Sequence, residues 1–371
     1  MKSENLLTIV LALSFLYACI FTDFWYTKTI QKKKKTLSFI LKNIKFSMGQ
    51  QVINALIQIG LFAIYVKLYN NFAFFSLPTT ALTYILAFIV LDHNTYWFHR
   101  FSHHNNFLWS NHMIHHSGEE FGLSVSIRNP WYASFLLAYP QLVLAFIGVP
   151  PKMFVVTVTV FYLFQFFSHL DSVGKLGILE KIFITPSHHR AHHASNAIYI
   201  DKNFGSVFVI WDKIFGTFQE ETETAQFGLT HPNTIENTFW ENSYTYYLNI
   251  AAVLKLKGLK EKVRFLFLAP SEVENYMRTN NLNYLYEKSQ KIDHWLRRFE
   301  LKLNHTGFIA SFILALILTV LFRAYYLEIS TTAQFLSAIV IIIMCTLLPD
   351  RAQAKEQATT QNLESFDLLK S

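Results

Sequence analysis

The sequence contains His112-Met113-Ile114-His115-His116, and the same spacing, H-x-x-H-H, returns at His189-Arg190-Ala191-His192-His193. A third segment, His99-Arg100-Phe101-Ser102-His103, precedes both with the spacing H-x-x-x-H. Histidine fills 15 of the 371 positions, so one H-x-x-H-H segment is expected by chance in about 2% of such chains, and two far more rarely. These three segments, called the histidine boxes, therefore indicate a functional site.

The spacing of the boxes is suited to metal binding. Residues three or four apart lie on one face of a helix, so each box directs two or three imidazoles at a common point. His169, four residues after Gln165 on the same predicted helix face, adds a further ring. Together these rings are enough for two metal ions. The predicted metal ligands are His99, His103, His112, His115, His116, His169, His189, His192 and His193.

Imidazole alone does not identify the metal, because it binds iron, zinc, copper and nickel. A site built only from histidine, without thiolates and at a membrane boundary, favours iron and oxygen chemistry on a lipid over structural zinc. A zinc hydrolase is disfavoured, since the sequence contains no H-E-x-x-H. Four residues are expected to support the ligands by hydrogen bonding. These are Asp92, Tyr96, Gln165 and Asn196.

Other histidines are interpreted differently. A lone histidine is usually solvated or hydrogen-bonded, and this is the expectation for His231, His294 and His305. His104 and His188 each adjoin a box histidine, but neighbours on a helix point about 100° apart, so both are left out of the ligand set. The roles of these two residues and of His93, which lies beside Asp92, stay open.

The composition indicates a membrane protein. Hydrophobic residues make up 52% of the chain and charged residues 15%, which is too apolar for a soluble domain of this length. Uncharged stretches, most of them long enough to cross a bilayer, occur at 6–22, 46–66, 68–91, 131–151, 153–168, 306–322 and 329–349. The predicted fold is an all-α integral membrane protein with about seven transmembrane or membrane-embedded helices and a cytoplasmic, histidine-rich helical cap.

Charge sets the expected orientation. Lysines concentrate in the loop after the first apolar stretch, between Lys28 and Lys45, which predicts that this loop is cytoplasmic. Alternating sides from there places all three boxes on the cytoplasmic side. The net charge of +7 is therefore attributed to membrane orientation, with anionic-lipid binding as a second possibility, and no nucleic-acid partner is expected.

The expected organisation has five parts. Their boundaries are 1–79 for N-terminal membrane helices with the basic loop, 80–232 for the metal domain, 233–305 for cytoplasmic amphipathic helices, 306–349 for C-terminal membrane helices and 350–371 for a disordered tail. The turn Gly148-Val149-Pro150-Pro151 joins the fourth and fifth apolar stretches into a hairpin. Whether this hairpin crosses the membrane or only enters it stays open.

Several motifs resemble the fatty acid hydroxylase and sterol desaturase superfamily. They are the boxes themselves, the segment Tyr96-Trp97-Phe98-His99-Arg100 after Asp92, the segment Thr185-Pro186-Ser187-His188-His189-Arg190, and the segments starting Asn203-Phe204-Gly205 and Trp211-Asp212-Lys213. The resemblance covers about residues 80–232. Within the superfamily, residues 165–230 are most similar to the alkylglycerol monooxygenase branch, although His104 stands where that branch tends to carry an acidic residue.

The resemblance implies a membrane-bound diiron oxygenase of the monooxygenase type that hydroxylates a lipid C–H bond with O₂. For the named branch it implies oxidative cleavage of alkylglycerol ether lipids with tetrahydrobiopterin; otherwise electrons would come from an external donor protein. Hydroxylation or desaturation of a fatty acid or sterol is the alternative. A transition-metal transporter is disfavoured, because transporters place polar ligands near the bilayer midplane. The exact lipid, the electron donor and the oligomeric state stay open.

Overall fold

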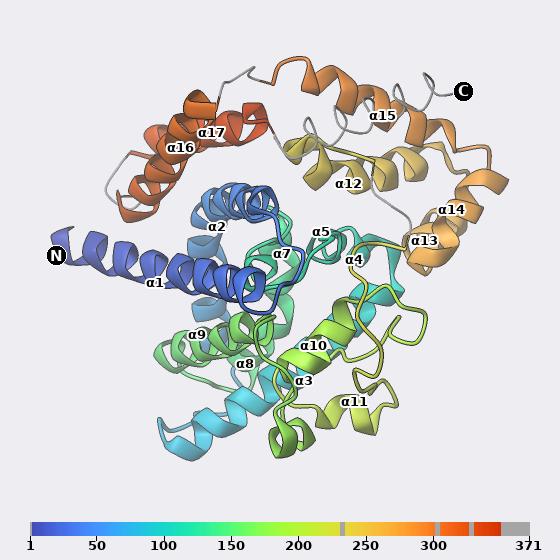
Figure 1. The fold of residues 1–371 in the computed structure, drawn as a ribbon. Coiled ribbons are helices and arrows are strands. Elements are labelled where there is room, and N and C mark those ends of the chain that lie inside the picture. The colour runs from blue at the N-terminus through green and yellow to red at the C-terminus, as the bar shows by residue number, and fades with distance from the viewer. Residues whose placement is uncertain (1, 231–233, 301–304, 326–329, 350–371) are drawn as a thin grey trace, which may run out of the picture.

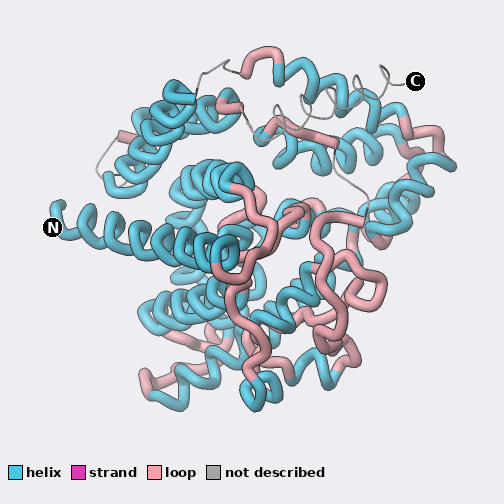
Figure 2. Tube along the Cα trace, viewed as in Figure 1, coloured by secondary structure: helices cyan, strands magenta, loops and turns pink. Residues whose placement is uncertain are grey.

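The computed structural model describes residues 2–230, 234–300, 305–325 and 330–349. Within these ranges the chain is helical and has no strand, as Figure 2 shows. Two isolated antiparallel β-bridges occur, one between Phe183 and Phe208 and one between Ala194 and Phe227. The predicted all-α class is therefore confirmed. The predicted tail 350–371 lies outside the described residues.

Most helices follow one another with short connections, but longer segments without helix precede and follow α11, at 194–209 and, among the described residues, at 215–237. Those of the first half are α1 (Lys2–Thr29), α2 (Leu37–Phe72), α3 (Ala81–His104), α4 (Asn106–Trp109), α5 (Met113–His116), α6 (Leu123–Ser126), α7 (Ala133–Leu137), α8 (Tyr139–Phe146) and α9 (Pro151–Ser168). Those of the second half are η1 (Gly177–Lys181), α10 (Pro186–His193), α11 (Ile210–Ile214), α12 (Thr238–Lys255), α13 (Leu259–Leu266), α14 (Pro270–Thr279), α15 (Tyr284–Arg297), α16 (His305–Tyr325) and α17 (Thr331–Leu347).

Helix α2 organises the long apolar helices (Figure 1). It packs against α16 and α17 on one side and against α8 on the other, while α3 packs on α8 and α9. Two apolar cores result: one includes Ile44 and Val52 of α2 with Ile341 of α17, and the other includes Leu91 of α3 with Phe161 of α9. Helices α12 to α15 form a separate arc with its own core (Figure 1).

Two of the helices, α2 and α9, are long and apolar enough to cross a membrane by length and composition. The prediction of about seven spans is thus supported for these two and stays a prediction for the rest. The third uncharged stretch, 68–91, does not form one helix: α2 continues to Phe72, and α3 begins at Ala81 and runs on through the first box. Pro78 and the N-cap Thr80, whose side chain accepts from the Thr83 amide, separate the two helices.

The hairpin before α9 contains two short helices, α7 and α8. Together they extend about 21 Å at 1.5 Å per residue, less than the ~30 Å hydrocarbon layer. Gly148 makes the turn with φ +89°, and a Cβ there would overlap the backbone of Phe75. The first arm of the hairpin is therefore shorter than a helical bilayer crossing, whereas α9, its second arm, is long enough for one.

Four lysines of the basic segment between Lys28 and Lys45 contact other parts of the chain. Lys33 and Lys35 both bind the carboxylate of Asp171, at 2.6 and 2.8 Å. Lys42 pairs with Glu241 at 3.1 Å, and the Lys45 ammonium donates to the Leu348 carbonyl at 2.6 Å. These four lysines therefore bind other parts of the chain, which limits the anionic-lipid binding proposed for this loop.

One contact in α2 gives a stability prediction. A Cβ on Gly49 would overlap the indole ring of Trp131, which is fully buried. Gly49→Ala should lower the free energy of unfolding by about 1–3 kcal/mol, because an added methyl overpacks a rigid contact. The control is Gly60→Ala in the same helix, where a Cβ would meet no atom within 4 Å. Thermal unfolding of the two purified variants checks this, and equal midpoints would contradict the packing.

Candidate metal centre

Local helix geometry places each box. His99 and His103 lie one turn apart near the end of α3. The second box starts at His112, the N-cap of α5, and ends with that helix. The third box ends α10, which starts at the N-cap Thr185 with Pro186 in its first turn. His169 is the C-cap of α9.

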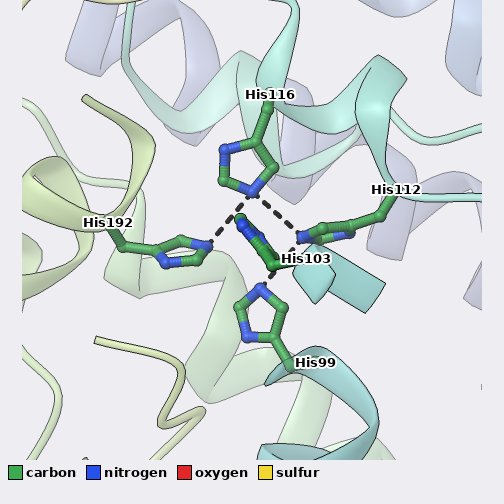
Figure 3. A group of neighbouring side chains, drawn as sticks. All are labelled: His99, His103, His112, His116 and His192. Atoms are coloured by element: carbon green, nitrogen blue, oxygen red, sulfur yellow. Dashed lines mark hydrogen bonds between the residues drawn. The ribbon is translucent and has the colours of Figure 1, made fainter. Parts of the chain in front are cut away.

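The structure brings all nine predicted ligands together in two groups. The five-histidine group consists of His99, His103, His112, His116 and His192, and the four-histidine group consists of His115, His169, His189 and His193. In each group the ring nitrogens available for a metal lie within 4.8 Å of one another. Figure 3 shows the rings of the first group converging on one point. The groups adjoin, since the ring centroids of His116 and His193 are 4.4 Å apart.

Backbone carbonyls fix the protonation of four of these rings. The Nδ1 atoms of His99, His192, His115 and His169 lie 2.9, 2.8, 3.2 and 2.8 Å from the carbonyl oxygens of Phe204, Lys202, Arg128 and Gln165, in that order. A carbonyl oxygen only accepts, so each Nδ1 must carry the proton. In the neutral ring each Nε2 then presents a lone pair, as in a metal ligand supported by a backbone acceptor.

The four-histidine group fits a cation better than it fits hydrogen bonding. The Nε2 atoms of His115 and His169 are 3.3 Å apart, and both carry lone pairs. Two lone pairs at that distance repel each other. His189 Nε2 lies 3.0 Å from His169 Nε2, while His189 Nδ1 is buried without a hydrogen-bond partner among the described residues. A bound metal ion would satisfy the converging Nε2 atoms together.

The five-histidine group gives the same result. Four Nε2 atoms form a series of three contacts. The Nε2 atoms of His99 and His112 are 2.9 Å apart, those of His112 and His116 are 3.0 Å apart, and those of His116 and His192 are 3.1 Å apart. His99 and His192, at the two ends of the series, present Nε2 lone pairs, so His112 and His116 between them would both need an Nε2 proton. Those two protons would then face each other. No assignment of protons makes all three contacts hydrogen bonds, so this group also fits a cation.

Burial keeps the rings in their metal-binding form. It lowers the pKa of His99 and of His169 to about 4. Burial likewise holds the pKa of the other seven rings well below the usual histidine value, with neighbouring histidines adding to the effect. Neutral imidazole is the form that ligates metals.

The predicted supporting residues need correction. Asp92 accepts from the amides of Val207 and Phe208 and from the Trp211 indole, not from a histidine ring. The Tyr96 hydroxyl bonds Thr217, and the Asn196 side chain bonds the segment 223–226. Gln165 does support His169, but through its backbone carbonyl. The side chains of Asp92, Tyr96 and Asn196 thus hold loops, while backbone oxygens support the rings.

Asp212 is a supporting residue that the sequence analysis did not assign. Its carboxylate accepts from the amides of Phe204 and Gly205 at 2.7 and 2.8 Å and from the Thr217 hydroxyl at 2.7 Å. It thereby fixes the segment whose Phe204 carbonyl accepts from His99. Asp212 could have been singled out in the sequence from the Trp211-Asp212-Lys213 motif, but that motif does not predict which groups the carboxylate binds.

Arg128 connects the second box to the rest of the chain. Its carbonyl accepts from His115, while its guanidinium donates to the Ile114 carbonyl at 2.9 Å and pairs with Glu241 of α12 at 2.7 Å. Both charged side chains are 3% exposed. The same guanidinium reaches Asn43 of α2 at 3.2 Å. Helices α2 and α12 therefore contribute to the position of His115.

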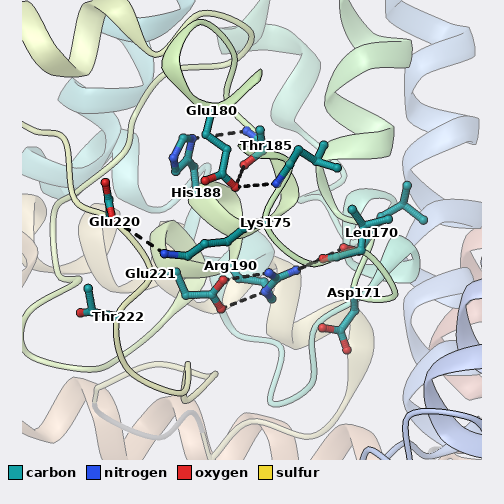
Figure 4. A network of polar contacts seen from close by, with 12 residues as sticks. Leu170, Asp171, Lys175, Glu180, Thr185, His188, Arg190, Glu220, Glu221 and Thr222 are labelled. Atoms are coloured by element: carbon teal, nitrogen blue, oxygen red, sulfur yellow. Dashed lines mark hydrogen bonds and ion pairs between the residues drawn. The ribbon is translucent and has the colours of Figure 1, made fainter. Parts of the chain in front are cut away.

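A second polar network surrounds α10 (Figure 4). Arg190 makes a two-pronged contact with Glu221, at 2.9 and 2.8 Å, and donates to the Val173 carbonyl at 2.7 Å. His188 belongs to the cap of this helix, since its Nδ1 accepts from the Thr185 amide at 3.5 Å. The network fixes the helix that carries the third box.

The remaining histidines of interest also lie outside both groups. His104 is 3.9 Å from the Asp201 carboxylate and is partly exposed. His93 accepts from the Trp97 indole at 3.2 Å. Their positions agree with leaving them out of the predicted ligand set.

The Asp212 contacts predict a specific loss. Asp212→Asn removes one acceptor from the segment that supports His99, so affinity for metal should fall roughly 10- to 100-fold. Asp293→Asn is the control, because the Asp293 carboxylate also accepts two backbone amides, those of Glu236 and Asn237, but supports no histidine. Iron titration of both variants checks this. Equal affinity in the two would show that Asp212 has no influence on the centre.

Comparison with known proteins agrees with this geometry. The fatty acid hydroxylase family model matches residues 84–217. The chain is 38% identical to the alkylglycerol monooxygenase of Danio rerio over 212 residues, 56% of this chain and 46% of the relative. It is 41% identical to that of Homo sapiens over 177 residues, 46% and 39% of the two chains.

A more distant relative is the ornithine lipid hydroxylase OlsE of Rhizobium tropici, 30% identical over 139 residues, 37% of this chain and 42% of the relative. The chain spans less than half the length of these relatives, and no solved structure matches it. The predicted resemblance to this superfamily and branch is confirmed: residues 84–217 match the fatty acid hydroxylase family model, and the chain is similar to the alkylglycerol monooxygenases.

Proposed function

We propose that this protein is a membrane-bound lipid monooxygenase whose two histidine groups each hold one iron ion. The observation that carries the proposal is the pair of groups, one half-buried to buried and the other buried, in which imidazole Nε2 atoms converge without a consistent hydrogen-bond pattern. The fatty acid hydroxylase domain and the monooxygenase relatives support it. Their names also support a lipid substrate and O₂ as the oxidant.

The chain itself supplies position and a dry environment. Two bound iron ions would supply what no side chain can, the redox activation of dioxygen toward an unactivated C–H bond. Trp109 packs against His103, with ring centroids 5.2 Å apart, and Phe121 packs against His193 at 5.5 Å. These rings limit the access of water to both groups. Electrons would come from a donor protein or from a reduced pterin such as tetrahydrobiopterin.

An ether lipid is the proposed substrate, because the alkylglycerol monooxygenases share a longer matched stretch with this chain than the ornithine lipid hydroxylase does. Hydroxylation of the carbon beside an ether oxygen gives a hemiacetal, which collapses to an aldehyde and a glycerol. The similarity to an ornithine lipid hydroxylase favours a second candidate, hydroxylation of an acyl chain. The metal site does not distinguish the two, since one site can serve many substrates.

The iron proposal predicts a stoichiometry. Purified protein should bind about two iron ions per chain, and His192→Ala should lose iron and reduce activity roughly tenfold or more, because His192 belongs to the five-histidine group. The exposed His294 gives the control variant His294→Ala, which should keep both. Metal analysis of the same preparations used for activity checks this, and full activity in iron-free protein would refute the proposal.

The substrate proposal predicts different products in two mixtures. Membranes containing the protein are given an alkylglycerol with tetrahydropterin, and separately a fatty acid or sterol with NADPH and a ferredoxin or cytochrome donor. Long-chain aldehyde should form in the first mixture, as mass spectrometry can show. Hydroxylated or unsaturated lipid in the second mixture alone would reject ether cleavage and leave a lipid oxygenase.

We also propose that the boxes face the cytoplasm, because the lysine-rich segment precedes α2 and α2 is long enough to cross a membrane. A topology reporter inserted near Lys34 should then report the cytoplasm, and one near Asn71, at the far end of α2, the opposite side. The reverse pair of signals would place the boxes outside.

A further inference from the structure

Helices α12 and α13 meet at a corner with an apolar outer surface. Ile250 and Leu254 of α12 are 62% and 73% exposed, Leu259 and Val263 of α13 are 77% and 47% exposed, and Phe267 after α13 is 70% exposed. Within each helix these residues are four apart, so they lie on one face. We name these five side chains the apolar corner. Large apolar side chains that gather on a surface mark an interaction site.

The opposite faces of both helices are already occupied. Ala252 of α12, Leu256 directly after that helix and Phe265 of α13 are buried in a core shared with Met277 of α14. The apolar corner therefore points away from the protein interior. Figure 1 shows α13 at the periphery of the molecule.

The charge around the apolar corner is strongly positive. Residues 250–267 contain five basic side chains and one acidic side chain, a net charge of +4. Lys255, Lys257 and Lys260 are exposed. The single acidic residue, Glu261, is engaged by the Tyr276 hydroxyl at 2.8 Å and by Arg264 at 3.7 Å.

We propose that the apolar corner docks on the surface of an anionic phospholipid bilayer. The five apolar side chains would lie among the upper acyl segments, and the lysines would extend to the phosphates, since their long apolar stems allow the ammonium groups to reach the headgroups. A second copy of this chain fits less well: a two-fold contact through this surface would bring two sets of +4 charges together.

The docking surface is joined to the candidate metal centre. The Leu268 carbonyl accepts from the Asn106 amide of α4 at 2.8 Å, and the Asn106 side chain bonds Asn249 of α12 at 2.7 Å. Helix α4 ends at Trp109, whose ring packs on His103. A bilayer bound at the apolar corner would thus lie beside the segment that joins the first two boxes. The inference is independent of the iron and substrate proposals.

The test uses the full chain in lipid nanodiscs. An environment-sensitive fluorophore is attached at Leu259→Cys or Phe267→Cys in a Cys19→Ser background, with Ser271→Cys, an exposed position on α14, as the control. Quenching by spin-labelled lipid in discs containing phosphatidylglycerol should be roughly threefold stronger at 259 and 267 than at 271. Replacing Lys255, Lys257 and Lys260 with glutamine, or using neutral lipid alone, should reduce that difference.

Two results would overturn the proposal. Equal quenching at all three positions, with full access of aqueous iodide, would show that the apolar corner lies in water. Protection of 259 and 267 from iodide without lipid quenching, accompanied by crosslinking between chains, would show a protein contact instead. Thermal unfolding midpoints equal to that of the unlabelled chain in the same discs show that the labelled protein is folded.

Discussion

Everything at the candidate centre depends on which nitrogen of each imidazole carries the proton. A ring can ligate a metal through Nε2 only if its proton is held at Nδ1, and here backbone carbonyls hold it in four of the nine rings. The carbonyl of Gln165 lies one turn before His169 on the same helix, whereas those of Phe204 and Lys202 come from a loop. The loop must therefore be as well fixed as the helices. Asp212 meets that requirement through three hydrogen bonds.

The sequence was informative where one local rule applied. Spacings of three and four residues place side chains on one helix face regardless of tertiary structure, so the boxes identified rings that the structure groups together. His169 followed from the same rule. Helix content was predictable in the same way, because long uncharged stretches without breaking residues form helices whether or not each one crosses a membrane.

The helix-face rule does not predict tertiary contacts. Every residue has a carbonyl, so no pattern could select Phe204 or Arg128 as the partner of a histidine. Asp92 and Tyr96 lie on the predicted helix face, yet their side chains reach the segment around Val207 and Thr217 and not a ring. The uncharged stretch 68–91 contains parts of two helices, because apolar content alone does not detect the cap at Thr80. Only the folded path of the chain determines these partners.

The buried pair of Arg128 and Glu241 shows why the site extends beyond the segment that matches the family. Desolvating two charges costs about as much as their attraction returns, so stability alone does not explain a pair that is 3% exposed on both sides. Arg128 and Glu241 together join three separate regions: α2 through Asn43 and Lys42, the second box through Ile114 and Ser117, and α12, which carries Glu241. Two of these regions lie outside residues 84–217. Because the Arg128 carbonyl accepts from His115, a shift of α2 or α12 would reach the four-histidine group directly. The matched domain supplies the rings, and the helices around it hold one of them in place.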